Sequence, residues 1–282
     1  MSYKTLLVPV SDATAVAAAA EPALALAGRW KAHVSVLHAR PSPESYAAFA
    51  AEGVSAVMVE DLIRSARKEM DARAGQAKSA FESVVKKAGI ATGKARPDAA
   101  TAAWLDAEGD AYDVVVKHGR AADLIVAARP ANATGAYPMT VDEFTLFDVA
   151  RPVLLLPTKM PATVGTRVAI AWNNSANAAH AVAGAMPFLL DAKAVTVIAP
   201  PDGDGGLLGE ALQRHGIAVQ PPVRFDAVPA QAGDKLLAEA QRLGADLLVM
   251  GAYGHSRMRE MILGGATRHI LHEAKLPVLI MH

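Results

Sequence analysis

Short, uninterrupted runs of Val, Ile and Leu alternate along this chain with longer segments in which apolar residues recur every three or four positions. Continuous apolar runs are typical of strands covered on both faces of a parallel sheet, and the longer spacing is typical of amphipathic helices. Alternation of the two implies right-handed strand–helix–strand crossovers. We therefore predict an α/β fold built from doubly wound parallel sheets.

The order of these elements repeats within the chain. Four pairs of apolar landmarks follow one another in the same order: residues 6–10 and 168–172, 32–37 and 194–198, 122–126 and 245–249, and 151–156 and 276–281. A repeat on this scale indicates two similar units in tandem. Pro161, Thr163 and Gly165 interrupt the apolar runs between the copies, so we predict domains at residues 1–160 and 161–282.

The two halves differ in the helix that follows their second strand. In the first half, apolar spacing over residues 62–85 predicts a long amphipathic helix with Gly89 as its C-cap. In the second half, the counterpart is shortened to a segment around residues 207–212, closed by Gly216. The Gly-rich residues 203–209 lack the complete dinucleotide fingerprint and the Lys-Ser/Thr of a P-loop, so they are expected to form a flexible connection.

Composition narrows the classes of function. The chain of 282 residues is 52% hydrophobic and 20% charged, with 28 basic and 28 acidic residues. This balance gives no electrostatic reason to expect a nucleic acid or an anionic membrane as partner. There are no cysteines, which excludes disulfides and thiolate chemistry. The absence of a long apolar run and of a basic leader predicts a cytoplasmic protein.

Glycines gather after the fourth strand of the second half. That strand is expected to run into Gly251 and Gly254, and residues 264–267 (Gly-Gly-Ala-Thr) are expected to open a helix. In doubly wound sheets, ligands bind beyond the carboxyl ends of the strands, where the strand order reverses. The two glycines would allow a close backbone approach, and the free amides of the helix start would stabilise an anion.

The stretch from Met250 to His282 resembles the C-terminal part of universal stress proteins of the nucleotide-binding branch. Their signature is Gly, two residues, Gly, nine residues, Gly and a small hydroxyl residue, and Gly251, Gly254 and Gly264 fit that spacing. The two halves together resemble tandem universal stress proteins over almost the whole sequence. The resemblance implies Rossmann-like domains of the adenine nucleotide alpha hydrolase type.

By this resemblance, the second half would bind ATP, ADP or AMP. The implied site residues are Ala171, Trp172, Asn173, Ile198, Met250, Gly251, Gly254, His255, Gly264, Gly265, Ala266 and Thr267. Asn173 stands where the family usually has Asp, and Gly265 where Ser or Thr is usual. A carboxylate and a hydroxyl are thereby lost, which leaves open which nucleotide is bound and whether Mg²⁺ accompanies it. For Trp172, the sequence leaves open whether the side chain packs within the protein or contacts a ligand.

The corresponding stretch of the first half lacks the three signature glycines. Pro130 has no amide N–H to offer, and Asp142 with Glu143 would repel a phosphate group. We predict that the first half no longer binds nucleotide and serves as a structural partner.

Two further pairs of residues could form a metal or a catalytic site, and the sequence supports neither. His269 and His272 lie three positions apart, but no third ligand follows at a matching spacing, so no metal site is assigned. Ser175 and His180 lack an acidic residue to orient the histidine, so no catalytic residue is assigned.

The leading hypothesis is a stress-linked regulator or sensor with adenine nucleotide in its C-terminal domain, and not an efficient catalyst. A slow ATPase or phosphotransferase, and a scaffold without nucleotide, are the alternatives. The resemblance also implies an intramolecular pseudo-dimer in which the final strands, at residues 153–156 and 278–281, pair. Covering these apolar edges would oppose aggregation. The sequence leaves open whether a homodimer forms.

Overall fold

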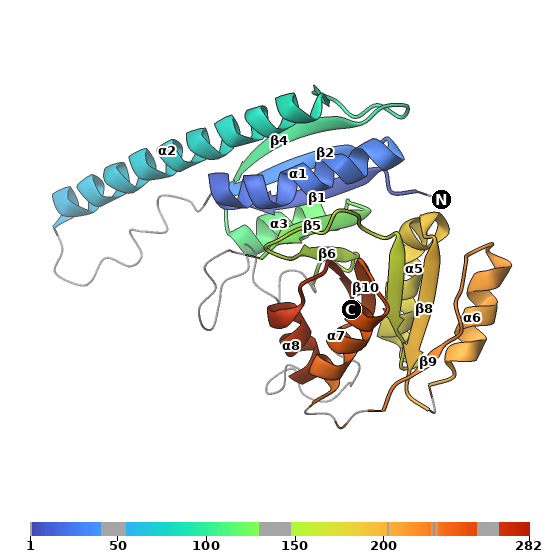
Figure 1. The fold of residues 1–282 in the computed structure, drawn as a ribbon. Helices are drawn as coiled ribbons and strands as arrows, with labels where there is room; N and C mark the ends of the chain where they lie inside the picture. Colours follow the sequence, from blue (N-terminus) through green and yellow to red (C-terminus); the bar gives the residue numbers. More distant parts are fainter. Residues whose placement is uncertain are drawn as a thin grey trace. The chain divides into compact units, whose positions relative to one another are not determined.

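The computed structural model describes residues 2–40, 55–129, 148–201, 203–226, 228, 231–252 and 265–282 (Figure 1). Its contacts divide the chain into a first unit, Tyr3–Val149, and a second unit that contains Ala150–His282. Both units are mixed α/β, as predicted. The division assigns the strand at Val153–Leu156 to the second unit. The predicted domain limits, residues 1–160 and 161–282, rest on the repeat and stay a prediction.

The first unit consists of β1 (Thr5–Val10), α1 (Ala13–Trp30), β2 (His33–Arg40), α2 (Ala56–Ala88), β3 (Ala91–Thr92), β4 (Thr101–Glu108), α3 (Ala111–Gly119) and β5 (Leu124–Ala128). Its strands are ordered β3-β4-β2-β1-β5, and all of these pairs are parallel. The strand order reverses at β1, because β2 lies on one side of it and β5 on the other. Right-handed crossovers then place α1 and α2 on one face of the sheet and α3 on the opposite face.

The second unit consists of β6 (Val153–Leu156), β7 (Arg167–Ala171), α5 (Ala176–Asp191), β8 (Ala194–Ala199), α6 (Gly205–Arg214), β9 (Val223–Arg224), α7 (Ala232–Arg242), β10 (Leu247–Gly251), α8 (Gly265–Glu273) and β11 (Val278–Met281). Its strands are ordered β6-β11-β10-β7-β8-β9. All pairs are parallel except β6 with β11, where Leu154 lies opposite Leu279 in an antiparallel register. The expected pairing of the two final strands is therefore present.

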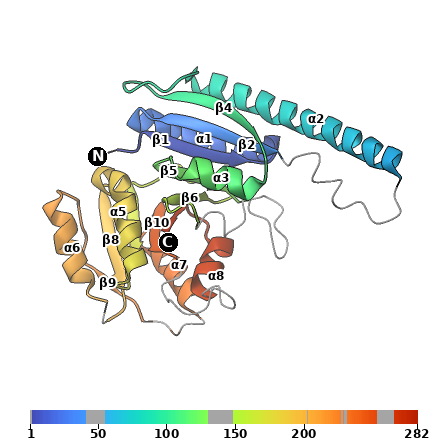
Figure 2. The ribbon, with the colours of Figure 1, turned by 180° about the vertical axis from the view of Figure 1, so that it is seen from behind.

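Helices cover both faces of the second sheet. α5 packs on β10 and β11, and α7 packs against α8, which Figure 2 shows from behind. Every residue of β5 and of β6 is buried. These strands are the uninterrupted apolar runs of the sequence, and their burial explains why polar residues do not alternate with apolar ones along them.

The predicted difference between the long and the short helix is confirmed. α2 has 33 residues and ends at Gly89, whose φ of 65° is the left-handed conformation that favours glycine. α6 has only 10 residues, and Gly216 follows it with a φ of 77°. The expectation of a flexible connection over residues 203–209 is wrong for 205–209, because the Asp204 side chain caps α6 and the helix begins at Gly205. Side chains of Asp12, Ser55 and Ser175 accept hydrogen bonds from first-turn amides and so begin α1, α2 and α5. None of the described helices is long and apolar enough to cross a membrane.

Candidate functional site

The strand order of the second unit reverses between β7 and β10, which makes their carboxyl ends the place where a ligand is expected. Met250 of β10 lies in register with Ala171 of β7, and Ala171 lies in register with Ile198 of β8. Neighbouring strands are about 4.8 Å apart, so the three residues form one short row across the sheet. The structure thus brings together three site residues that lie far apart in the sequence.

The turn after β7 is held by its own polar groups. The backbone N–H of Trp172 donates to the carbonyl oxygen of Ile198 at 2.9 Å, which carries the β7–β8 pairing one residue beyond the strand. Asn173 is exposed, and its side-chain oxygen accepts a hydrogen bond from the Ser175 amide at 3.2 Å. Asn174 adopts a left-handed φ of 58°. Asn173 therefore shapes the turn that leads into α5, a role that an Asp side chain would also perform.

Gly251 ends β10 beneath the first turn of α5. A Cβ atom at this position would come within 2.5 Å of the Ala178 amide nitrogen and of the Asn177 carbonyl carbon. Real Cβ atoms essentially never approach backbone so closely, and so only glycine fits. The sequence predicted a glycine that lets a ligand approach, whereas the close neighbour that the structure shows is the protein's own helix. Contact of Gly251 with a ligand stays a prediction.

Asn177 and His282 are two residues at this edge that the sequence analysis missed. The Asn177 side-chain amide donates to the carbonyl oxygen of Ala252, directly after β10, and its nitrogen lies 2.9 Å from Nδ1 of His282. The Ala252 amide in turn donates to the carbonyl oxygen of Met281 at 2.9 Å. The first turn of α5 is therefore tied to the ends of both β10 and β11. The only signal in the sequence is one Asn within an Ala-rich helix start.

The remaining predicted contacts lie at the start of α8. Gly265 and Ala266 are its first two residues, and Thr267 is buried at 7% exposure. Because α8 follows β10 in a right-handed crossover, its amino end lies at the same edge as the row formed by β8, β7 and β10. Gly254, His255 and Gly264 lie outside the described residues.

The matching position of the first unit has different chemistry. Val10 ends β1 and lies in register with His38 of β2. Residues 6–10 of β1 match residues 168–172 in the repeat, so His38 is the counterpart of Ala199, one residue beyond Ile198. His38 is buried at 4% exposure, and its ring stacks on Trp104 with 5.7 Å between the centroids. An aliphatic side chain in one unit is replaced by an imidazole in the other.

His38 belongs to a polar network that fills this part of the first unit. Its Nδ1 lies 3.2 Å from a carboxylate oxygen of Asp106 in β4, and Nε of Arg40 lies 3.1 Å from the same oxygen. Nη1 of Arg40 also donates to Asp71 of α2 at 3.0 Å. The network joins β2, β4 and α2. The sequence analysis did not identify it, because its members come from three separate segments, at residues 38–40, 71 and 106.

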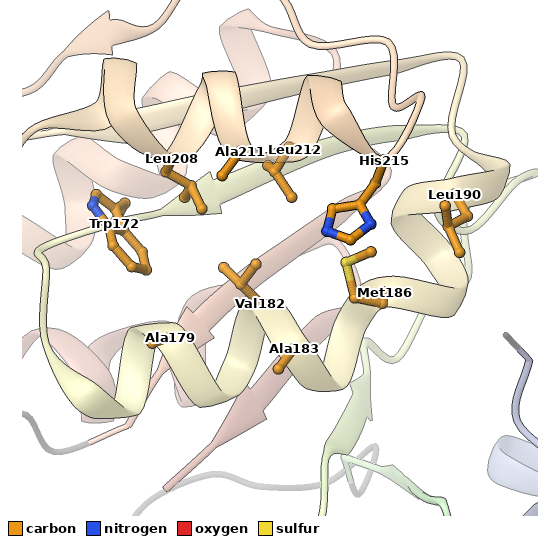
Figure 3. A pocket seen from close by; sticks show the side chains of 10 residues that line it. All are labelled: Trp172, Ala179, Val182, Ala183, Met186, Leu190, Leu208, Ala211, Leu212 and His215. Atoms are coloured by element: carbon orange, nitrogen blue, oxygen red, sulfur yellow. The ribbon is translucent and has the colours of Figure 1, made fainter.

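Two helices in the second unit leave an apolar groove between them. It has a volume of about 480 Å³ and lies between α5 and α6 (Figure 3). The half-buried Trp172 lines one end of it, so this side chain takes part in the packing around α5 and α6. Whether the indole also contacts a ligand stays a prediction.

The histidines of α8 have structural neighbours. Nε2 of His269 lies 2.8 Å from a carboxylate oxygen of Asp234 in α7, and this pair links the two helices. Within the described ranges, no group of three or more His, Asp or Glu side chains is arranged to hold a metal ion.

Comparison with known proteins gives a match in the second unit. The sequence model of the universal stress protein family matches residues 207–282. A universal stress protein of Synechocystis is 50% identical over 34 residues, which is 12% of this chain and 12% of that protein. The matched segment thus spans only a small part of this curated relative.

Solved structures match over the full length. A universal stress protein from Archaeoglobus fulgidus superposes with a TM-score of 0.70 and 18% identity, covering 100% of this chain and 99% of the other. A universal stress protein from Pseudomonas aeruginosa superposes with a TM-score of 0.55 and 17% identity, covering 99% of this chain and 93% of the other. At these identities the likeness shows the fold.

Proposed function

We propose that this chain is a universal stress protein, a member of a family of stress-response proteins, and that its second unit binds one adenine nucleotide. The observation that carries the proposal is the row of Ala171, Ile198 and Met250 at the point where the strand order reverses. Apolar side chains at such an edge suit the faces of a base, and the amino end of α8 suits a phosphate group.

The proposal limits nucleotide to one site per chain. In the first unit this edge of the sheet holds His38, which the Asp106 carboxylate and the Trp104 ring already engage. Two further acidic residues, Asp142 and Glu143, follow in the sequence. A phosphate group entering there would meet negative charge, which favours the interpretation of the first unit as a structural partner.

We propose regulation or sensing as the role, with ATP, ADP or AMP as the bound form and a cytoplasmic location. The described residues of the proposed site include no Asp or Glu that could act as a general base or hold Mg²⁺. If the protein binds a nucleotide without hydrolysing it, the bound fraction follows the nucleotide concentration. The conformation that the nucleotide stabilises is then populated in the same proportion. Nucleotide binding would then alter the surface offered to a partner protein.

The direct test identifies what the purified protein carries. Freshly purified chain is denatured, and the released small molecules are separated by ion exchange with mass detection. We expect adenine nucleotide near one equivalent per chain, and its phosphate count identifies the bound form. Two equivalents would contradict the loss of the first site. If none is released, titration calorimetry with ATP, ADP and AMP decides, and no heat with any of them rejects nucleotide binding.

A pair of glycine variants tests the location. Gly264→Asp places a carboxylate where the family signature puts phosphate, and we expect it to abolish binding. Gly206→Asp is the matched control, because Gly206 lies at the exposed start of α6 with no atom within 4 Å of an added Cβ. Equal affinity of both variants would reject the assignment.

A slow ATPase or phosphotransferase at the same site remains the second candidate. It predicts steady phosphate release from ATP that stays proportional to protein through successive purification steps. That release should disappear in Gly264→Asp and persist in Gly206→Asp. Release that is unaffected by both changes belongs to a contaminating enzyme.

A further inference from the structure

The groove between α5 and α6 has almost entirely aliphatic walls. Ala179, Val182, Ala183, Met186 and Leu190 of α5 face Leu208, Ala211 and Leu212 of α6, with Trp172 toward one end and His215 toward the other (Figure 3). α5 has no Asp, Glu, Lys or Arg before its last residue, Asp191. Apart from Asn177 and His180, the rest of the helix is apolar, and the apolar faces of a helix are normally covered. The exposed groove face of α5 departs from that rule.

The first unit shows what covers the corresponding face. α1 is the counterpart of α5, and α2 packs along it as the counterpart of α6. Nζ of Lys87 in α2 lies 2.7 Å from a carboxylate oxygen of Glu21 in α1, which marks how closely the two helices approach. The buried residues of α2 are Ala74, Ala77, Phe81 and Val85, all in its second half. A long amphipathic helix thus closes in the first unit the space that the short α6 leaves open in the second.

The apolar stripe of α2 continues into its first half, where it is only partly covered. At intervals of three or four positions it comprises Val59, Leu62, Ile63, Ala66 and Met70. No described residue between 57 and 73 is buried, and Leu62 is 47% exposed. Figure 1 shows this half of α2 running beyond α1 and the strands of its own unit. The chain therefore has both an amphipathic helix with an exposed apolar face and an apolar groove.

The two surfaces match in length. Residues 59–70 of α2 and residues 179–190 of α5 each span eleven helical steps, or about 16 Å at 1.5 Å per residue. An amphipathic helix laid into an apolar groove is a common mode of protein recognition. Charged residues such as Arg64 and Lys68 lie on the other side of α2 and would stay in water.

We propose that the groove between α5 and α6 receives the first half of α2 from a second copy of this chain. Exchange of two such helices between two copies repeats the same contact about a two-fold axis and closes the assembly as a dimer. The proposal does not rest on nucleotide binding, because, of the groove residues, Trp172 alone also belongs to the implied nucleotide site.

Sedimentation velocity of the full chain over a range of concentrations tests the dimer. We expect wild type to dimerise and Leu62→Glu to remain monomeric at every concentration. Val57→Glu is the matched control, since Val57 is 68% exposed and lies about 140° around the same helix from Leu62. The Val57→Glu variant should dimerise like wild type. A monomeric wild type, or a Leu62→Glu variant that dimerises equally well, overturns the proposal.

A change on the groove side tests the partner surface. Ala183 is exposed on α5, so Ala183→Glu adds a charge to the groove without crowding the core. We expect this variant alone to be monomeric. Mixing it with Leu62→Glu should restore a weaker association, because one of the two contacts then combines an intact stripe with an intact groove. No association in the mixture, or self-association of Ala183→Glu, contradicts the exchanged helix.

An apolar dye whose fluorescence rises on binding tests whether the groove binds a small molecule and not a helix. If wild type stays monomeric and binds the dye, and only Ala183→Glu loses it, the groove holds a small apolar ligand and the helix proposal is wrong. Nucleotide content of both variants serves as the folding control and separates this test from that of the proposed function.

Discussion

Gly251 and Ala178 lie so close that a single added carbon would separate β10 from α5. A Cβ on Gly251 would sit 2.5 Å from the Ala178 amide nitrogen, which belongs to the first turn of α5. The contact involves backbone, and backbone cannot rotate away as a side chain can. The first glycine of the family signature is therefore required by the fold of the second unit, before any ligand is considered.

Gly251→Ala should accordingly destabilise the protein. Overpacking of this kind costs about 1–3 kcal/mol, which should lower the urea midpoint of the second unit. Gly206→Ala is the control, because Gly206 lies within α6 with open space around it, and there alanine should be neutral or slightly stabilising. Equal midpoints for the two variants would contradict the close contact.

Trp172 provides a spectroscopic probe of the second unit. The chain has three tryptophans, and Trp30 and Trp104 both belong to the first unit. If nucleotide binds beside β7, adding it should change the emission of Trp172. Trp172→Phe should remove that change while calorimetry still detects binding. A change that persists in this variant would place the nucleotide, or its effect, in the first unit.

Because position 173 is Asn and not Asp, we expect the nucleotide affinity to depend only weakly on Mg²⁺. A neutral amide attracts a divalent cation less than a carboxylate does, and so nucleotide affinity should be similar in Mg²⁺ and in EDTA. Asn173→Asp should raise affinity in Mg²⁺ but not in EDTA. The variant should fold normally, since an Asp oxygen can accept the same hydrogen bond from the Ser175 amide. Unchanged affinity in both conditions would exclude position 173 from the metal environment.

Asp12 should make stability depend on pH. Burial alone raises the pKa of this carboxyl, but hydrogen bonds from the Ala15 amide, the Ser11 hydroxyl and the Thr14 amide outweigh it, and the pKa lies below its usual value. A lowered pKa means that the stabilisation is fully present above the unfolded-state pKa, about 4, and is lost as pH falls through the folded-state value.

Asp12→Ala should therefore cost about 0.5–2 kcal/mol near neutral pH, the usual range for loss of an N-cap. The difference from wild type should shrink as the pH falls below about 4. Asp12→Asn keeps a capping oxygen that does not titrate, so its stability should fall less steeply with acid. Urea unfolding at several pH values measures the stability of wild type and of both variants. If the stability of wild type and of Asp12→Asn falls equally with decreasing pH, Asp12 is not the group that makes stability depend on pH.

The order of elements follows from the sequence because burial on both faces requires uninterrupted apolar runs. β5 and β6 are examples, since each of their residues is buried. The ends of α2 and α6 were likewise predictable, because Gly89 and Gly216 can adopt the left-handed conformation that ends a helix. The glycine spacing after β10 pointed to the carboxyl edge of the second sheet as the candidate site, and this assignment stays a prediction.

The tertiary structure decided which residues meet there. The register that aligns Ile198, Ala171 and Met250 depends on strand pairing between segments up to about eighty residues apart. The approach of Ala178 to Gly251, and the contacts of His38 with Asp106 and Trp104 in the first unit, also involve distant partners. Local patterns in a sequence report burial and backbone conformation. Contacts between distant segments arise only when the sheet pairs and the helices pack upon it.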